Sequence, residues 1–403
     1  LALRVLVLCD RYPDSYQDGL LLRVLHLARW IGVRHDLDLI AYHDGERSPE
    51  HEEFFRRVWT VPRPRAKAAP GWLAPFTGWA VRDFYPPSVE LCDLLERELR
   101  ADEYDLVWDA GASIFQQLPS GWDHVPVVAD LVDDMVLTSR RALLATKGFS
   151  ARLRQLKYLS HYYRFERYVM RRAAVCVVVS EEDAESFRRV SPTVPVSVVQ
   201  NGVDLDYFAP SDRPQIPGRL VFEGSMAFGP NQLAAIHLVT EVMPLVWAQR
   251  PDATVTLVGR DPSAEILALR SDRVQVTGSV PDVRPYVQEA EVFVCPLLSG
   301  AGIKNKLLQA WAMGKAVVAT TVSVGGLKVL QGRNVIVANA AREMADAVLD
   351  LLANPLKRQL LGDEGRQTVA AEYSWAGRAA SFEGLLMQAA NAGQAGGRLT
   401  GKV

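Results

Sequence analysis

Apolar runs alternate with amphipathic stretches along most of the chain. The runs at 4–10, 174–180 and 291–296 are apolar and rich in β-branched residues, which is typical of strands buried in a parallel sheet. Between such runs, apolar residues recur three or four positions apart, as in helices that pack on a sheet. The alternation predicts an α/β fold with parallel sheets.

This alternation occurs twice, with a polar break in between. Residues 209–218 contain three prolines, and the strand and helix pattern starts afresh after them. Proline-rich polar segments are typical of domain linkers. We therefore predict two doubly wound, Rossmann-like domains over 1–208 and 219–374, joined by a linker at 209–218. A helix is expected at 375–394, followed by a disordered, glycine-rich tail at 395–403.

One loop in the second half has the features of a phosphate site. A strand that ends near Pro296 leads into a segment with Gly300 and Gly302 and then into a helix. Glycines allow backbone N–H groups to face outward, and the start of a helix adds unpaired N–H groups and the positive end of its dipole. Lys304 and Lys306 add positive charge at the same place. The loop is therefore predicted to bind a phosphate or diphosphate.

In the first half, polar residues gather where the predicted strands end. The loop after the first strand carries Asp18 and Gly19, with Arg23 just beyond, at the edge where open α/β sheets bind ligands. Asp133 and Asp134 close a later strand, where a carboxylate can act as a general base or hold a sugar hydroxyl. The plainer alternatives are a connecting loop for the first group and a helix cap or surface charge for the second.

The amino-acid composition limits which partners the protein can bind and where in the cell it is expected. The net charge of −2 provides no basic field for nucleic acid, and no apolar run approaches the ~18 residues that span a bilayer. Four cysteines lie far apart and form no metal-ligand spacing with histidine, which favours reduced thiols and a cytoplasmic location. Two segments are compatible with peripheral contact with the inner membrane face. They are a proline-rich and aromatic segment at 63–87 and a basic, tyrosine-rich helix at 153–172. Solvated surface is the alternative for both.

Several motifs, in this order and spacing, make the chain resemble retaining glycosyltransferases of the GT-B fold, family 4 (group 1). In the second half they are 258–262, 276–284, 291–327 and 373–375. In the first half, the segments 18–23, 130–133, 179–183 and 201–204 resemble a branch associated with exopolysaccharide clusters. The resemblance implies two Rossmann-like domains facing across a cleft, with C-terminal helices that pack back toward the first domain.

The resemblance also implies an activity and its partners. A sugar would move from a UDP- or GDP-linked donor to an acceptor hydroxyl with retention, without a catalytic metal or a separate cofactor. The acceptor would be a sugar, a lipid-linked glycan or a small metabolite. The residues implied to contact the donor are Gly19, Arg23, Gly224, Ser225, Asn231, Arg260, Val280, Gly300, Gly302, Ile303, Lys304, Leu308 and Gln309. The catalytic candidates are Lys304, Asp133, Asp134 and Asp18.

Two departures from the family pattern affect these assignments. The family commonly has two glutamates eight residues apart across the loop, and here those positions are Ala301 and Gln309. Gln309 can still bond ribose hydroxyls, but without a charge. The basic pair that many members have after the first strand of the second domain is missing from 226–231, which leaves Lys304 as the main cation at the diphosphate.

Two other activities stay open at this point. The protein could bind a nucleotide sugar without turnover or carry out another coupling reaction, as a pseudo-glycosyltransferase of the same fold. It could also be a nucleotide-sugar 2-epimerase, which shares this architecture. The sequence does not name the donor sugar, the base or the acceptor.

Overall fold

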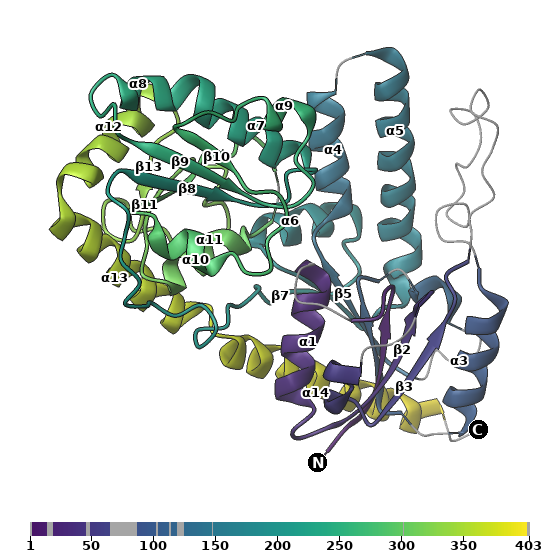
Figure 1. Ribbon diagram of the computed structural model, residues 1–403. Coiled ribbons are helices and arrows are strands. Elements are labelled where there is room, and N and C mark those ends of the chain that lie inside the picture. The colour runs from purple at the N-terminus through teal and green to yellow at the C-terminus, as the bar shows by residue number, and fades with distance from the viewer. Residues whose placement is uncertain are drawn as a thin grey trace. The chain divides into compact units, whose positions relative to one another are not determined.

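The computed structural model describes residues 2–13, 19–45, 49–64, 87–101, 104–112, 114–118, 125–146, 148–300 and 302–400. The chain forms two compact units, which we describe separately (Figure 1). Unit 1 comprises Leu1–Gln200 and Ala376–Val403, and unit 2 comprises Asn201–Trp375. The segment 209–218, predicted as the linker, therefore lies inside unit 2. No described helix is both long enough and apolar enough to span a bilayer.

Unit 1 is built on a seven-stranded sheet in the order β3-β2-β1-β4-β5-β6-β7, with every pair parallel. Its strands are β1 (Arg4–Cys9), β2 (Asp36–Tyr42), β3 (Arg57–Val61), β4 (Leu106–Ala110), β5 (Val127–Val132), β6 (Val175–Val178) and β7 (Val196–Val198). Its helices are α1 (Gly19–Ile31), α3 (Val89–Ala101), α4 (Met135–Ala145), α5 (Phe149–Arg164), α6 (Glu181–Val190) and most of α14 (Trp375–Thr400). Short 3-10 segments are η1 (Pro49–Phe54), η2 (Phe115–Gln117) and η4 (Met170–Arg172), and η3 (Phe165–Val169) is a short π-helical segment.

Unit 2 repeats this design on a six-stranded parallel sheet in the order β10-β9-β8-β11-β12-β13. Its strands are β8 (Arg219–Glu223), β9 (Thr254–Val258), β10 (Val274–Val276), β11 (Val292–Cys295), β12 (Ala316–Ala319) and β13 (Ile336–Val337). Its helices are α7 (Gly229–His237), η5 (Leu238–Val242), α8 (Met243–Trp247), α9 (Ala264–Leu267), α10 (Arg284–Glu289), α11 (Asn305–Ala312), α12 (Ala341–Ala353) and α13 (Pro355–Glu372).

Both strand orders confirm the predicted pair of doubly wound sheets. The order reverses between β1 and β4 in unit 1 and between β8 and β11 in unit 2. In open parallel sheets, ligands bind outside the carboxyl ends of the strands at this reversal. The central strands of unit 2 are buried over most of their length, as their apolar sequence predicted. These strands are β8, β9, β11 and β12.

Helix α14 packs on the sheet of unit 1. Phe382, Leu386 and Ala390 recur at helical spacing and are buried, and the Phe382 ring lies 5.0 Å from that of Trp108 on β4. Figure 1 shows the helix passing close to α1. The helix continues to Thr400, whereas a disordered tail was predicted from residue 395. Packing of this buried stripe on the sheet stabilises the helix, and glycine content alone did not indicate it.

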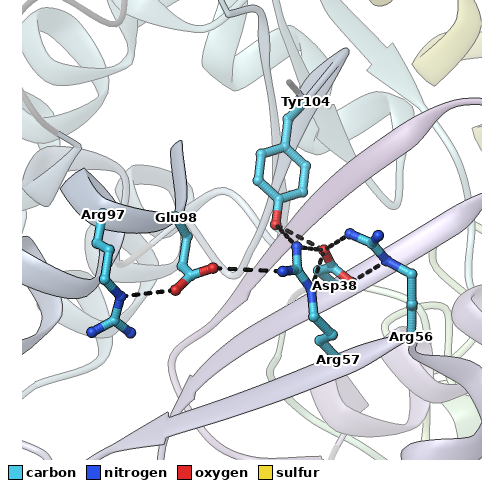
Figure 2. Close-up of polar contacts among 6 residues, drawn as sticks. All are labelled: Asp38, Arg56, Arg57, Arg97, Glu98 and Tyr104. Atoms are coloured by element: carbon cyan, nitrogen blue, oxygen red, sulfur yellow. Dashed lines mark hydrogen bonds and ion pairs between the residues drawn. The ribbon is translucent and has the colours of Figure 1, made fainter. Parts of the chain in front are cut away.

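A network of charged side chains joins the amino ends of the strands in unit 1 (Figure 2). The buried carboxylate of Asp38 on β2 accepts hydrogen bonds from Arg56, from Arg57 and, at 2.8 Å, from the hydroxyl of Tyr104. Arg57 also lies 3.8 Å from Glu98 of α3. Burial raises the pKa of Asp38, but the hydrogen bonds from both arginines and Tyr104 outweigh it and leave that pKa below its ordinary value. This carboxylate is therefore stabilised in its charged form.

Candidate functional site

The loop between β11 and α11 is the segment predicted from the sequence to bind a phosphate. Gly300 and Gly302 have φ values of 135° and 67°, a region that favours glycine. Lys304 is the N-cap of α11, and its side chain makes no capping bond to the helix. Its ammonium instead donates to the carbonyl of Gly302 at 2.6 Å. The first N–H groups of α11 thus sit beside a lysine at the carboxyl end of β11, as the sequence predicted, while Ala301 lies outside the described residues.

A second lysine joins α11 to the end of β8. The Lys306 ammonium donates to the carbonyl of Glu223 at 2.6 Å and to Oδ1 of Asn231 at 2.9 Å, and it lies 4.7 Å from the ring centre of Phe222. An ammonium has three N–H donors, so these two bonds leave one more for a ligand. Lys306 was predicted as positive charge at the phosphate loop, but no contact was named for it. Its position in the first turn of α11, two residues after Lys304, was the available signal.

Gly224 makes this approach of the lysine sterically feasible. It has φ 153°, and a Cβ at this position would collide with Nζ of Lys306 and lie 2.7 Å from Nδ2 of Asn231. Nδ2 of Asn231 also donates to the carbonyl of Ser225 at 2.9 Å. The structure therefore brings together Gly224, Ser225 and Asn231, all predicted donor contacts, around Lys306, which was predicted only as positive charge at the loop.

Glu223 is a further group at this edge that sequence reasoning missed. Its side chain is half-buried at the end of β8, beside Lys306. Burial raises the pKa of this carboxyl, and the charge of Lys306 offsets that effect only in part. A glutamate at the last position of an apolar strand, before a glycine, was its only sequence signal.

The remaining predicted donor contacts in unit 2 divide into surface and core positions. Arg260 is exposed after β9, Val280 is half-buried after β10, and Gln309 is half-buried on α11. Leu308 and Ile303 are buried in the core instead. The side chain of Leu308 is on the apolar face of α11 and belongs to the core, so a ribose near this residue would meet the backbone or the neighbouring Gln309.

In unit 1, Arg23 is fixed inside the protein. Its side chain is fully buried, its Nε bonds both carboxylate oxygens of Asp130 at 2.8 and 3.1 Å, and one terminal nitrogen donates to the carbonyl of Val199 at 2.9 Å. This differs from the predicted donor contact, because the guanidinium holds α1 to the end of β5 rather than facing solvent. Gly19 is the first residue of α1, and Asp18 lies outside the described residues.

The two aspartates after β5 have different environments. Asp134 is buried and caps α4, accepting a bond from the N–H of Leu137 at 2.5 Å, so the helix-cap alternative holds for it. Asp133 is half-buried and follows a register shift at Val132, which has φ 66°. Positive φ at a β-branched residue is strained, and such strain gathers at functional sites. Asp133 is thus the better placed of the two to meet a ligand.

Asp134 belongs to a buried group of three carboxyls that we call the acid cluster, together with Glu166 and Asp183. Glu166 accepts from the N–H of Val136 at 3.2 Å, and Asp183 accepts from the N–H of Asp134 at 3.2 Å. Burial is the main cause that raises the pKa of each, that of Asp134 to about 6 and that of Glu166 well above its ordinary value. In the described part of the chain, none of the three pairs with a lysine or arginine, and no metal-binding group of acidic, histidine or cysteine side chains is present. Sequence reasoning did not identify Glu166 or Asp183.

Two models of known protein families match the chain, one mainly over unit 1 and one over unit 2. The model described as Glycosyltransferase Family 4 matches residues 18–207, and that described as Glycosyl transferases group 1 matches residues 217–354. The chain belongs to the family 4 (group 1) glycosyltransferases. This confirms the family indicated by the motifs of the sequence.

Solved structures of this fold align over nearly the whole glycosyltransferase chain. Sucrose-phosphate synthase from Thermosynechococcus elongatus has a TM-score of 0.71 at 18% identity and covers 96% of this chain and 98% of its own. Anabaena HepE in complex with UDP and glucose has a TM-score of 0.66 at 14% identity, with 96% and 99% covered. At these identities the similarity establishes the GT-B fold.

Curated relatives match over shorter stretches. A GDP-mannose-dependent monoacylated phosphatidylinositol monomannoside mannosyltransferase of Corynebacterium glutamicum is 28% identical over 34% of this chain and 39% of its own. An alpha-maltose-1-phosphate synthase of Mycobacterium tuberculosis is 26% identical over 51% of this chain and 60% of its own. The matched part thus spans less than two thirds of either relative.

Proposed function

We propose that this glycosyltransferase moves a sugar from a nucleotide diphosphate sugar to an acceptor hydroxyl, with retention at the anomeric carbon. Both family models support transfer of a sugar, and relatives named for a GDP-mannose donor and solved with UDP support a nucleotide-linked donor. The retaining outcome and the donor class are part of the proposal and rest on the family resemblance.

The observation that carries the proposal is the charged, glycine-lined start of α11 at the strand reversal of unit 2. Lys304 and Lys306 lie there with the uncapped N–H groups of the helix. In sugar transfer from a nucleotide diphosphate, negative charge develops on the leaving diphosphate. Preorganised N–H donors and ammonium groups aimed at that charge stabilise the transition state more than the ground state. We assign the diphosphate to this position.

The other contacts follow from the same placement. Gln309 lies on α11 about one turn beyond Lys306, where its amide can bond ribose hydroxyls. Arg260 and Val280 follow the neighbouring strands β9 and β10, and this supports our assignment of the base to that side of the sheet. In unit 1, Asp133 is our candidate for accepting a proton from, or bonding, a sugar hydroxyl, whereas Asp134 supports it by capping α4.

Metal independence is a separate part of the proposal. The two lysines and the helix N–H groups provide positive charge where many nucleotide-dependent enzymes use a divalent cation. We expect donor binding and transfer to persist in the presence of a chelator. Loss of both in chelator, with recovery on addition of Mg²⁺ or Mn²⁺, would reject this part while leaving the diphosphate assignment intact.

Calorimetric titration with nucleotides tests the function directly. UDP or GDP should bind, and the matching nucleoside should bind at least about tenfold more weakly, because it lacks the diphosphate. Incubation with a panel of nucleotide sugars should then release the nucleoside diphosphate. Nucleotide binding without any release indicates a binding protein or pseudo-glycosyltransferase, and an epimerised sugar product from donor alone indicates an epimerase.

A further inference from the structure

The hairpin formed by α4 and α5 carries charge of a single sign. From residue 135 to residue 165 the chain has no aspartate or glutamate. The same segment contains seven cations, namely Arg140, Arg141, Lys147, Arg152, Arg154, Lys157 and Arg164. The whole chain has a net charge of −2, so this positive segment is not a reflection of overall composition. A charge distribution of this kind favours an anionic partner.

Three of these cations make no ion pair within the described part of the protein. Arg140, Arg152 and Arg154 are exposed, and within the described part of the chain they pair with no carboxylate. Arg141 differs, because it pairs with Glu182 of α6. The three unpaired guanidinium groups are available to a partner without first breaking an ion pair.

The tip of the hairpin is apolar and lies between these cations. Leu144 near the end of α4 is 84% exposed, and Phe149 at the start of α5 is 86% exposed. From Phe149 to Ser160, no residue of α5 is buried, and α5 packs mainly on α4, with which it stands out from the sheet of unit 1 (Figure 1). Exposing two large apolar side chains at one tip is unfavourable in water, so the tip is suited to an apolar environment.

The start of α5 adds to the positive field at the tip. Gly148, its N-cap, provides no side-chain capping bond, and no acidic residue lies in the first turn. At a rise of 1.5 Å per residue, Arg152 and Arg154 lie within about 10 Å of Phe149 along the helix, which is about one Debye length at physiological salt. The helix dipole, the arginines and the apolar tip thus act at one place.

We propose that the tip of the α4–α5 hairpin docks on the surface of a membrane that contains anionic lipids. Leu144 and Phe149 would insert at the boundary between headgroups and acyl chains, and Arg140, Arg152 and Arg154 would meet lipid phosphates. Apolar side chains flanked by arginines are the combination that holds peripheral proteins at anionic bilayers. A soluble polyanion would use the arginines but would leave the two apolar side chains exposed, so the bilayer fits better.

Vesicle sedimentation of the full chain tests this proposal. The parent protein should sediment with vesicles of phosphatidylcholine mixed with phosphatidylglycerol and should stay in solution with phosphatidylcholine alone. The double variant Arg152→Gln/Arg154→Gln should bind the mixed vesicles about 25-fold more weakly, at roughly fivefold per arginine. The double variant Leu144→Ser/Phe149→Ser should lose about tenfold or more.

Matched variants separate a local effect from general charge or hydropathy. Arg188→Gln/Arg189→Gln removes the same charge from α6 of unit 1, and Leu356→Ser removes an exposed apolar side chain from unit 2. Both should bind like the parent. Equal losses in these controls, or equal binding to neutral and mixed vesicles, would overturn the proposal.

Heparin provides the remaining comparison. The parent protein could bind heparin, show no binding to mixed vesicles, and keep its heparin affinity in Leu144→Ser/Phe149→Ser. This result would identify a soluble polyanion as the partner and would also overturn the proposal. Nucleotide binding by unit 2, measured on the same samples, reports on the proposed transfer function separately, so failure of one proposal is distinguishable from failure of the other.

Discussion

The two parallel sheets share one strand order but differ in the charge at their carboxyl ends. In unit 2, the end of β11 carries Lys304 and Lys306 beside uncapped helix N–H groups. In unit 1, Asp134 and Asp183 follow β5 and β6 and form the acid cluster with Glu166 of η3, and among the described residues none of the three makes an ion pair with lysine or arginine. Strand order decides where a ligand binds, and the side chains at that edge decide which charge it has. The positive edge of unit 2 is the one to which we assign the anionic donor, and the edge of unit 1 is the one to which we assign the acceptor hydroxyl.

Within unit 1, buried carboxyls at the two ends of the sheet have pKa values shifted in opposite directions. Asp38 at the amino end and Asp134 at the carboxyl end are both buried. Arginines and a tyrosine lower the pKa of Asp38, whereas burial beside other acids raises that of Asp134 to about 6. The ionised Asp38 at the amino end therefore stabilises the fold at neutral pH. The ionised Asp134 at the carboxyl end lowers the free energy of unfolding, as buried groups at functional sites often do.

The largest expected effect is on stability, in the variant Asp134→Asn. A folded pKa of about 6 against an ordinary 3.8 means that folding favours the protonated acid. The contribution of this group to stability is therefore full at low pH and is lost as pH rises through about 6. The asparagine variant should raise the free energy of unfolding by about 3 kcal/mol above pH about 7 and by little near pH about 4. Denaturant titrations at both pH values measure this difference.

Asp38→Asn is the matched control at the other end of the sheet. Its lowered pKa stabilises the fold above the ordinary pKa of an aspartate, and that contribution is lost as pH falls. This variant should therefore destabilise the protein at neutral pH, and the effect should shrink in acid. Destabilisation by both variants at neutral pH would contradict the contrast between the two ends.

The next effect is on donor binding, in the variant Lys306→Met. Methionine keeps an unbranched apolar side chain of similar length but removes the ammonium, which lies 4.7 Å from the ring centre of Phe222. A charge-assisted bond contributes about 1.5–3 kcal/mol, so affinity for the nucleoside diphosphate should fall by about 30-fold. Lys328→Met, which removes an exposed ammonium paired with Glu372 elsewhere in unit 2, should leave affinity unchanged. Equal affinity in parent and Lys306→Met would place the diphosphate elsewhere.

A smaller loss is expected for Lys304→Ala. Its ammonium at the N-cap of α11 bonds the carbonyl of Gly302 in the same loop, whereas Lys306 joins α11 to Glu223 and Asn231, so Lys304→Ala leaves those two links intact. Donor affinity or turnover should fall by about tenfold. Kinetics with saturating and limiting donor separate binding from turnover, and unchanged values for both would remove Lys304 from the site.

The smallest effect is expected for Gln309→Glu. The glutamate restores the residue type that the family commonly has at this position, and both side chains can accept a bond from a ribose hydroxyl. Turnover should stay within about threefold of the parent or rise. Loss of activity in a variant that still folds would show that the ribose does not lie at this turn of α11.

Local sequence patterns predicted most of the fold and part of the site. Buried strands such as β6 and β11 are short apolar runs, and the glycines before α11 mark a loop whose geometry depends on the backbone alone. Both signals lie within a few neighbouring residues, so periodicity and turn chemistry identify them.

The remaining features depend on contacts between distant segments. Arg23 was assigned to the donor because it follows the first strand, but its partner Asp130 is 107 positions away. Lys306 and Glu223 meet across 83 positions, and the acid cluster joins three separate segments. No single-sequence pattern shows that such side chains meet. The unit boundary at Gln200, in place of the proline-rich segment 209–218, likewise depends on packing.

The most direct measurement compares UDP with UMP, or GDP with GMP, in calorimetric titrations of the parent and of Lys304→Ala/Lys306→Met. The two nucleotides of a pair differ by one phosphate, so their affinity ratio reports on the groups that hold it. If the start of α11 holds the diphosphate, the parent should bind the diphosphate at least about tenfold more tightly, and the ratio should approach one in the double variant. A ratio that stays the same in both proteins would contradict the assignment.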